Sequence, residues 1–497
     1  MLRHNLHIKD FLIKLMLRIW RKIIKCSFGL FEKVERFLLD MLILKRSEKN
    51  INKDTQGRYD ILQPMELFFN QKRFDIVFKY FYAKWASITK SDFPKQVYLS
   101  HIFAFNNFYE DEPHKKQPVD FLDSFNELLG SVRKDGFNRD YPVSVHPNGE
   151  LENGVHRFVS AMVTNNEIPT IISNTNGKTY YDYRFFNERG IPDDFSDLNA
   201  CLYVPMNHFA RIFFLFPAAE PQYDYLVRNI LNKYGFIYYE KELRLTYNGY
   251  INLKKIIYSK DKNNPCDETS ANSYNYLKMY ALNSIADGKS PLRVLVWVCK
   301  YDNDYITVVR EIKSIYSIIN YNSYFYLSNT HEEAIELSQI MFNENSLYCL
   351  DNRPHELNTY EFDNYIEIVK QDLILQKVPL ETVCACENSP MFVFGISKFN
   401  KISFLCIDKF KDSIVNNFDV DDFLLVHKDE IILNPKYHFF YHGIKIITLD
   451  VLFQFINNRN EQPNDVNDCY LIRKFKDRSW SMMSMKRFDE KPESGNA

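Results

Sequence analysis

Residues 141–172, YPVSVHPNGELENGVHRFVSAMVTNNEIPTII, constrain the fold more than any other stretch of this 497-residue chain. Residues 141–146 alternate apolar and polar side chains, which is typical of a half-buried strand. Residues 147–149 have turn chemistry, because asparagine and glycine tolerate a positive φ. An apolar helical run follows Gly154 and stops at Asn165, and Ile168 opens another strand. The stretch therefore predicts two short strands, a tight turn, a helix and a further strand in one unit.

The turn at residues 154–157 has the composition of an anion-binding site. Gly154 lets the backbone approach a ligand closely, and the helix that follows offers free N–H groups and the positive end of its dipole. His156 and Arg157 add donors, and an arginine can form two parallel hydrogen bonds to a phosphate. This pattern predicts a phosphate or nucleotide site at Gly154, His156 and Arg157. The alternative is a glycine turn whose arginine makes a surface ion pair.

Acid–base chemistry at this turn would need a group that moves a proton. His156 is one candidate catalytic residue, and Glu127 and Glu152 are the carboxylates nearest to the turn in the sequence. For both glutamates the alternative is a solvated surface position. The nine cysteines are scattered and only Cys384 and Cys386 are close, so the sequence predicts no protein-bound metal site.

The segment N-G-V-H-R at residues 153–157, with its small-residue helix and the following I-P-T, resembles the core box of the ParB/sulfiredoxin superfamily. The resemblance implies that the strand, turn and helix cradle a nucleoside triphosphate or diphosphate with Mg²⁺. Val155 stands where sulfiredoxins have a reactive cysteine, which argues against sulfinic-acid reduction. Superfamily members include CTP-hydrolysing DNA clamps and free-serine kinases. The box thus implies a nucleotide more strongly than it implies a reaction.

The N-terminal half also resembles ParB/sulfiredoxin-like proteins encoded in bacterial surface-polysaccharide gene clusters. The motifs that carry this resemblance are RFDIVFKYFYAK at residues 73–84, HIFAFNNFYE at 101–110 and FLDSFNEL at 121–128. The resemblance implies a role in capsule or lipopolysaccharide assembly, with polysaccharide-assembly proteins as partners.

The patterning of the whole chain predicts a multidomain protein of mixed α/β (α+β) class. The almost purely apolar run Leu292–Cys299, for example, predicts a central strand that is covered on both faces. We expect the following parts: 1–46 a basic amphipathic helix, 47–57 a linker, 58–191 the ParB/sulfiredoxin-like domain, 192–352 a middle α/β domain, 353–478 a C-terminal domain and 479–497 a disordered tail.

The C-terminal domain resembles a nucleotidyltransferase that has lost its metal ligands. Such enzymes carry a Gly-Ser pair and then a strand with two aspartates that hold Mg²⁺ and the triphosphate. Here Asn388 and Ser389 stand at the first position, and Lys401 and Ser403 replace the aspartates. Neither lysine nor serine can replace a carboxylate on Mg²⁺, so we expect no nucleotidyl transfer. A shifted register could recruit the aspartates at 408, 419 and 421, for which a solvated acidic loop is the alternative.

Residues 1–46 predict peripheral attachment to an anionic membrane. Residues 1–50 contain twelve Lys or Arg and five Asp or Glu, a net +7, and the chain total of −2 leaves −9 for the rest. Charges interrupt the apolar run too often for a spanning helix. A basic helix with Phe11 and Trp20 can lie in a membrane interface, and the alternative is a helix that packs on protein. We expect a cytoplasmic protein, peripheral at the inner face of the membrane.

Two functions follow from these observations. The first is a nucleotide-dependent phosphotransferase that acts on a small molecule or glycan precursor through Gly154, His156 and Arg157. The second is a non-catalytic assembly or regulatory protein of the same pathway that uses the nucleotide as a switch. DNA is an unlikely partner, because the part of the chain beyond residue 50 is acidic and no basic recognition helix follows the turn.

Overall fold

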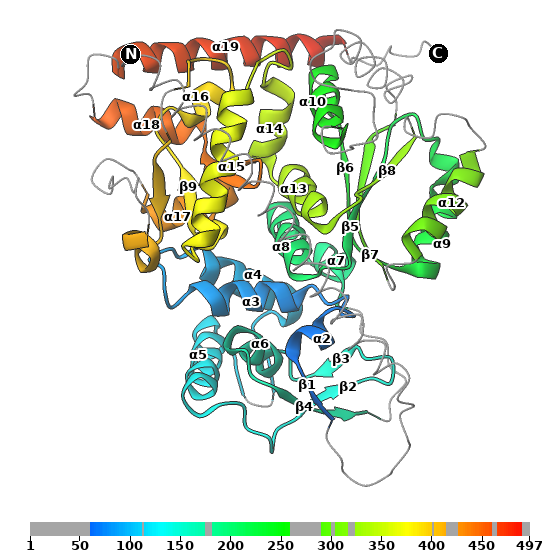
Figure 1. The fold of residues 1–497 in the computed structure, drawn as a ribbon. Helices are drawn as coiled ribbons and strands as arrows, with labels where there is room; N and C mark the ends of the chain where they lie inside the picture. The colour runs from blue at the N-terminus through cyan, green and yellow to red at the C-terminus, as the bar shows by residue number, and fades with distance from the viewer. Residues whose placement is uncertain are drawn as a thin grey trace, which may run out of the picture. The chain divides into compact units, whose positions relative to one another are not determined.

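The structure is a computed structural model that describes residues 60–111, 114–173, 181–258, 290–299, 304–316, 324–399, 402–413, 426–459 and 465–489. The predicted basic helix at 1–46 and the linker at 47–57 lie outside these residues. The described chain is a mixture of helices with three four-stranded sheets, which confirms the mixed α/β class (Figure 1). Within these residues, no helix combines the length and the apolar composition needed to cross a membrane.

The first sheet contains the unit predicted at residues 141–172. Its strand order is β1-β4-β2-β3, where β2 and β4 are parallel and the other two pairs are antiparallel. The strands are β1 (Asp60–Leu62), β2 (Val143–Val145), β3 (Leu151–Asn153) and β4 (Ile168–Ile172). The helices of this part are α2 (Pro64–Phe68), α3 (Asp75–Trp85), α4 (Phe93–Asn106), α5 (Pro118–Asp135), α6 (Val155–Thr164), α7 (Tyr183–Asn187) and α8 (Asp193–Met206).

The second sheet has the order β6-β7-β5-β8, and all three of its pairs are antiparallel. Every residue of β7 is buried, which confirms the central strand expected from the apolar run. The strands are β5 (Ala210–Leu215), β6 (Gly235–Leu243), β7 (Leu292–Cys299) and β8 (Phe325–Leu327). The helices are α9 (Asp224–Tyr234), α10 (Tyr247–Tyr258), α12 (Asp304–Tyr316), α13 (His331–Met341) and α14 (Glu344–Asn352).

Alternate residues of β5 and β7 belong to two different apolar cores, because successive side chains point to opposite faces. Phe213 and Trp297 pack with Ile312 of α12 in a small core on one face. Ile212 and Val296 join the main core on the other face. Figure 1 shows α9 and α12 beside the first of these faces.

The third sheet has the order β10-β9-β12-β11, in which β9 and β12 are parallel and the outer pairs are antiparallel. Its strands are β9 (Val383–Ala385), β10 (Phe404–Cys406), β11 (His438–Tyr441) and β12 (Ile444–Ile447). The helices are α15 (Tyr360–Leu375), α16 (Ser389–Val393), α17 (Lys428–Leu433), α18 (Leu449–Arg459) and α19 (Asp465–Asp489), with the short 3-10 turn η3 (Leu380–Thr382) before β9.

The three sheets share one main core. Buried apolar residues from Leu67 to Ile472 form a continuous cluster, and residues 60–497 form one compact unit. The boundaries that we predicted at 191/192 and 352/353 therefore separate sheets that share a core.

One prediction about a helix limit was wrong. We expected no structure from residue 479 onward, but α19 continues to Asp489 (Figure 1). The segment RFDIVFKYFYAK at residues 73–84 is helical only from Asp75, where α3 begins. The residues before Asp75 are held by contacts with β3 and the β2–β3 turn, which spacing alone does not reveal: Gln71 Nε2 donates to the Gly149 carbonyl at 2.9 Å.

Candidate functional site

Gly154 connects β3 to α6 and is the first residue of the candidate site. Its φ of +88° lies in the left-handed region, which glycine adopts without strain. A methyl group added there would lie 2.9 Å from Nη2 of Arg157 and 3.1 Å from Cγ1 of Val143. Glycine is therefore required both by the turn and by the close approach of Arg157.

The first turn of α6 has no side-chain cap. Gly154 occupies the N-cap position and has no side chain to accept a hydrogen bond from the helix N–H groups. Its own N–H is bound by Oδ1 of Asn153 at 2.6 Å. A helix start of this kind has unsatisfied donors and a partial positive charge, both of which suit an anion.

One terminal nitrogen of Arg157 is held by two main-chain carbonyls, and no carboxylate of the described residues pairs with the side chain. Nη1 donates to the carbonyl of Tyr141 at 2.7 Å and to that of Pro142 at 2.9 Å. These bonds fix the side chain against the segment that enters β2. Burial alone lowers the pKa of Arg157, and no carboxylate in the described part of the chain pairs with it. The surface ion pair that we considered as an alternative is absent from these residues.

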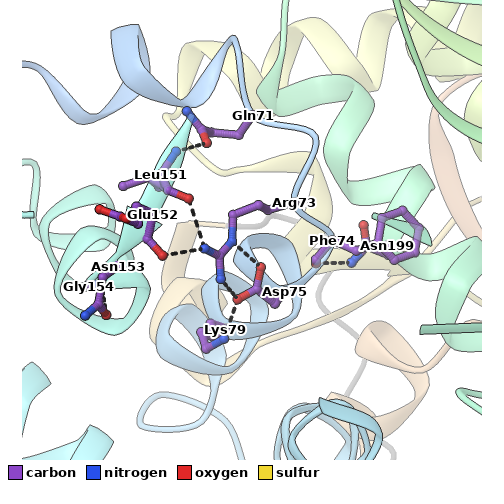
Figure 2. Close-up of polar contacts among 10 residues, drawn as sticks. All are labelled: Gln71, Arg73, Phe74, Asp75, Lys79, Leu151, Glu152, Asn153, Gly154 and Asn199. Carbon is purple, nitrogen blue, oxygen red and sulfur yellow. Dashed lines mark hydrogen bonds and ion pairs between the residues drawn. The ribbon is translucent and has the colours of Figure 1, made fainter. Parts of the chain in front are cut away.

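Beside the turn, three charged side chains form a buried cluster that we call the Arg73 cluster: Arg73, Asp75 and Lys79 (Figure 2). Arg73 donates from Nε to Oδ1 of Asp75 at 3.0 Å and from Nη2 to Oδ2 at 2.9 Å. Lys79 Nζ donates to the same Oδ2 at 2.8 Å. All three residues are at most 5% exposed. One carboxylate therefore faces two cationic side chains, and burial lowers the pKa of Lys79.

The Arg73 cluster also holds the strand that leads into Gly154. Nη1 of Arg73 donates to the carbonyls of Leu151 at 3.0 Å and Glu152 at 3.3 Å (Figure 2). Burial by itself would raise the pKa of Asp75, but Arg73 and Lys79 outweigh it and hold that pKa well below the usual range. The carboxylate therefore stays ionised and keeps Arg73 in position.

Our sequence reasoning quoted Arg73–Lys84 only as a motif and assigned no role to these charges. The sequence did contain a signal for a buried ion pair, because Asp75 and Lys79 are four residues apart on the apolar side of a helix. Charged residues are rarely buried there unless they are paired.

His156 points into an aromatic environment. Its Nε2 lies 3.1 Å from the hydroxyl of Tyr98, and its ring makes an edge contact with Phe125 at a centroid distance of 4.7 Å. Burial, assisted by Lys79 and His101, lowers the pKa of His156 well below its ordinary value. The imidazole is therefore neutral at pH 7 and supplies no charge to an anion.

His101 lies in the same environment. The residue is fully buried and its ring stacks on Phe78 at a centroid distance of 5.5 Å. Burial and the nearby Lys79 lower the pKa of His101 well below its ordinary value. Both histidines are thus kept neutral close to the Arg73 cluster.

The two candidate carboxylates differ in their surroundings. Oε2 of Glu152 accepts a hydrogen bond from the hydroxyl of Ser144 at 2.5 Å, so its carboxylate is oriented within the β2–β3 pair. Glu127 is exposed on α5. β3 connects the Arg73 cluster to Gly154, and Arg157 lies beside Gly154, whereas Glu127 makes no described contact with any of them.

The residues of the degenerate transferase site are engaged in local bonds. Ser389 is buried and donates to the carbonyl of Cys386 at 2.8 Å, and Ser403 donates to the carboxylate of Glu387. Asn388 precedes α16 and does not cap it with its side chain. Lys401, Asp419 and Asp421 lie outside the described residues, while Asp408 pairs with Lys428 at 2.7 Å.

Comparison with known proteins gives no match for this chain. No protein-family model matches it, and neither a curated protein nor a solved structure does so. In the described residues, no group of three or more His, Cys, Asp or Glu side chains is arranged to hold a metal ion.

Proposed function

We propose that this protein binds a nucleotide through the Gly154–Arg157 turn. The observation that carries the proposal is the half-buried guanidinium of Arg157, which has no carboxylate partner in the described chain and whose Nη2 lies beside the uncapped start of α6. An unpaired charge held out of water is unfavourable unless an anion approaches it. A phosphate group would accept from Nη2 and from the helix N–H groups together.

The Arg73 cluster supports the same proposal. Arg73 holds two carbonyls of the strand that leads into the turn, so the backbone around Gly154 is fixed before a ligand arrives. A preformed site loses less conformational entropy on binding. The resemblance of the N-terminal half to proteins of bacterial surface-polysaccharide clusters supports a role for the nucleotide in that pathway, with Mg²⁺ bound to its phosphates.

Two uses of the nucleotide follow, each from a different observation. The orientation of Glu152 by Ser144 favours phosphoryl transfer to a small molecule or glycan precursor, with Glu152 as the proton acceptor. The neutral, aromatic-bound His156 and the exposed Glu127 favour a nucleotide-switched assembly or regulatory protein. A Glu152→Gln variant distinguishes the two functions. If the protein is a phosphotransferase, the variant should bind nucleotide but transfer no phosphoryl group. If the nucleotide is a switch, neither the parent chain nor the variant should show turnover.

Calorimetric titration tests the binding site. ATP, ADP, CTP and sugar nucleotides are titrated with Mg²⁺ into the full chain and into Arg157→Ala and Arg157→Lys variants. Loss of a charged hydrogen bond of ~1.5–3 kcal/mol weakens affinity roughly ten- to hundredfold. Lysine should recover only part of this, because an ammonium group lacks the planar fork.

Arg133 provides a matched control for Arg157. It also donates to a main-chain carbonyl, that of Ala83 at 3.2 Å, but it is exposed on α5 away from the turn. Arg133→Ala should leave nucleotide affinity unchanged. If Arg157→Ala lowers the melting temperature while every nucleotide binds as it does to the parent chain, Arg157 is structural and the proposed site is wrong.

A further inference from the structure

A small cavity lies between helices α3 and α8 and the third-sheet region, and no residue of the Gly154 turn lines it. It has a volume of about 50 Å³ and is lined mainly by large apolar side chains of α3, α8 and the third-sheet region, among them Phe81, Trp85, Leu198, Leu202 and Phe440. A water needs about 10–15 Å³ of such a volume, so the cavity has room for about three to five water-sized groups. One lining side chain, Lys445 of β12, is a potential nucleophile.

Lys445 is buried without a carboxylate partner. Its Nζ donates to the main-chain carbonyls of Glu381 at 2.8 Å and Ile432 at 2.7 Å, and the residue is 8% exposed. The carboxylate of Glu381 is engaged by a different lysine, Lys84, at 2.5 Å. Among the described residues, Lys445 thus has two hydrogen-bond acceptors and no counter-ion.

Two acceptors match a neutral amine better than an ammonium group. An ammonium has three N–H donors and would leave one of them unsatisfied inside the protein, whereas a neutral amine has two. When both hydrogens point at the carbonyls of Glu381 and Ile432, the fourth tetrahedral position of the nitrogen carries its lone pair. The two carbonyls therefore orient the amine as a nucleophile in an apolar setting.

The groups around Lys445 shift its equilibrium towards the neutral amine. Burial lowers the pKa of Lys445 to about 8, and Lys84 acts in the same direction, while Cys384, Glu381 and Cys201 act against it. His438, which also lines the cavity, is kept neutral: burial and then Lys445 lower its pKa to about 3. With a pKa of about 8, roughly a tenth of the amine is neutral at pH 7.

We infer that Lys445 is a reactive amine that forms a Schiff base with a small apolar aldehyde or ketone bound in this cavity. The nitrogen lone pair bonds to the carbonyl carbon, and the carbonyl oxygen leaves as water with both amine hydrogens, which gives an imine. This site is independent of the nucleotide site proposed above, because Lys445 lies on β12 and the Gly154 turn lies between β3 and α6.

Reductive trapping on the full chain tests the inference. Propanal and cyanoborohydride are added at pH 7, where the hydride of the reagent converts the imine into a stable secondary amine, and modified lysines are found by peptide mass spectrometry. An amine with a pKa of about 8 instead of 10.5 is neutral about 300 times more often at pH 7. After allowance for restricted entry, we expect Lys445 to react at least tenfold faster than the exposed Lys95 and Lys436.

Two further measurements make the result specific. The rate at Lys445 should level off above about pH 8, while the rates at Lys95 and Lys436 continue to rise. Glyoxylate, an anionic aldehyde of similar size, should show no preference for Lys445, and Leu202→Phe, which fills the cavity, should reduce propanal labelling at least fivefold. Labelling of Lys445 no faster than of the two exposed lysines, or a rate that keeps rising to pH 10, would overturn the inference.

Discussion

Replacing Gly154 with alanine should destabilise the protein in two ways. It strains the backbone of the turn, and the added methyl group contacts the guanidinium of Arg157. A left-handed conformation costs an alanine about 1–2 kcal/mol. At Gly154 the methyl group would also lie 2.9 Å from Nη2 of Arg157, a distance that requires the guanidinium to move. A movement large enough to break the bonds from Nη1 to the carbonyls of Tyr141 and Pro142 costs a further ~1.5–3 kcal/mol.

Gly149 is the matched control for this change. Its φ of +83° is close to that of Gly154, but a methyl group there would meet nothing within 4 Å. Gly149→Ala should therefore lower the free energy of unfolding by about 1–2 kcal/mol and leave nucleotide affinity intact. Gly154→Ala should lower it by about 2.5–5 kcal/mol and weaken nucleotide binding at least tenfold.

Urea unfolding and calorimetric titration of both variants give the comparison. The difference between the two alanine variants removes the backbone strain that they share and isolates the contact with Arg157. Equal destabilisation, together with equal nucleotide affinity, would refute the claim that Gly154 makes room for Arg157 at a phosphate site.

Three further predictions follow. Asp75→Asn leaves Arg73 and Lys79 buried without a counter-charge and should lower the free energy of unfolding by about 3–5 kcal/mol in urea at pH 7. Because the pKa of Asp75 is lowered in the folded state, the parent chain should lose this stability only as the pH falls below about 3.8. A urea midpoint in the variant equal to that of the parent would contradict this prediction. His442 lies between Glu336 and Asp363, and although burial opposes its charge, these carboxylates raise its pKa to about 9. Its contribution to the free energy of unfolding is therefore complete below pH 6.5 and disappears as the pH rises through 9. The variant His442→Asn, in which asparagine tolerates the φ of +47°, should show a urea midpoint that does not change over this pH range. Deletion of residues 1–46 should abolish co-sedimentation with anionic liposomes at low salt, since each Lys or Arg near such a surface contributes ~1 kcal/mol, and an unchanged bound fraction would show that these residues do not hold the protein there.

The sequence predicted those features that depend on neighbours along the chain. Gly154 and Asn165 have positive φ values at the two ends of α6, as their residue types suggested, and the apolar run of β7 became a buried central strand. The φ of a turn residue depends on its own side chain, and the burial of an apolar run depends on its total hydrophobicity. Both can be predicted without knowing which distant segments they contact.

Only the tertiary structure decided what the polar groups do. Arg73 reaches the carbonyl of Leu151, 78 residues away, and Lys445 reaches that of Glu381, 64 residues away. His156, which the sequence offered as a charged donor, is neutral because Tyr98 and Phe125 surround it. The charge of such groups depends on burial and on nearby dipoles and ions, which are set when distant segments pack together. The sequence therefore determined where α6 begins and ends, and the packing of α3, β3 and β12 determined which side chains near these elements are charged, neutral or free to bind.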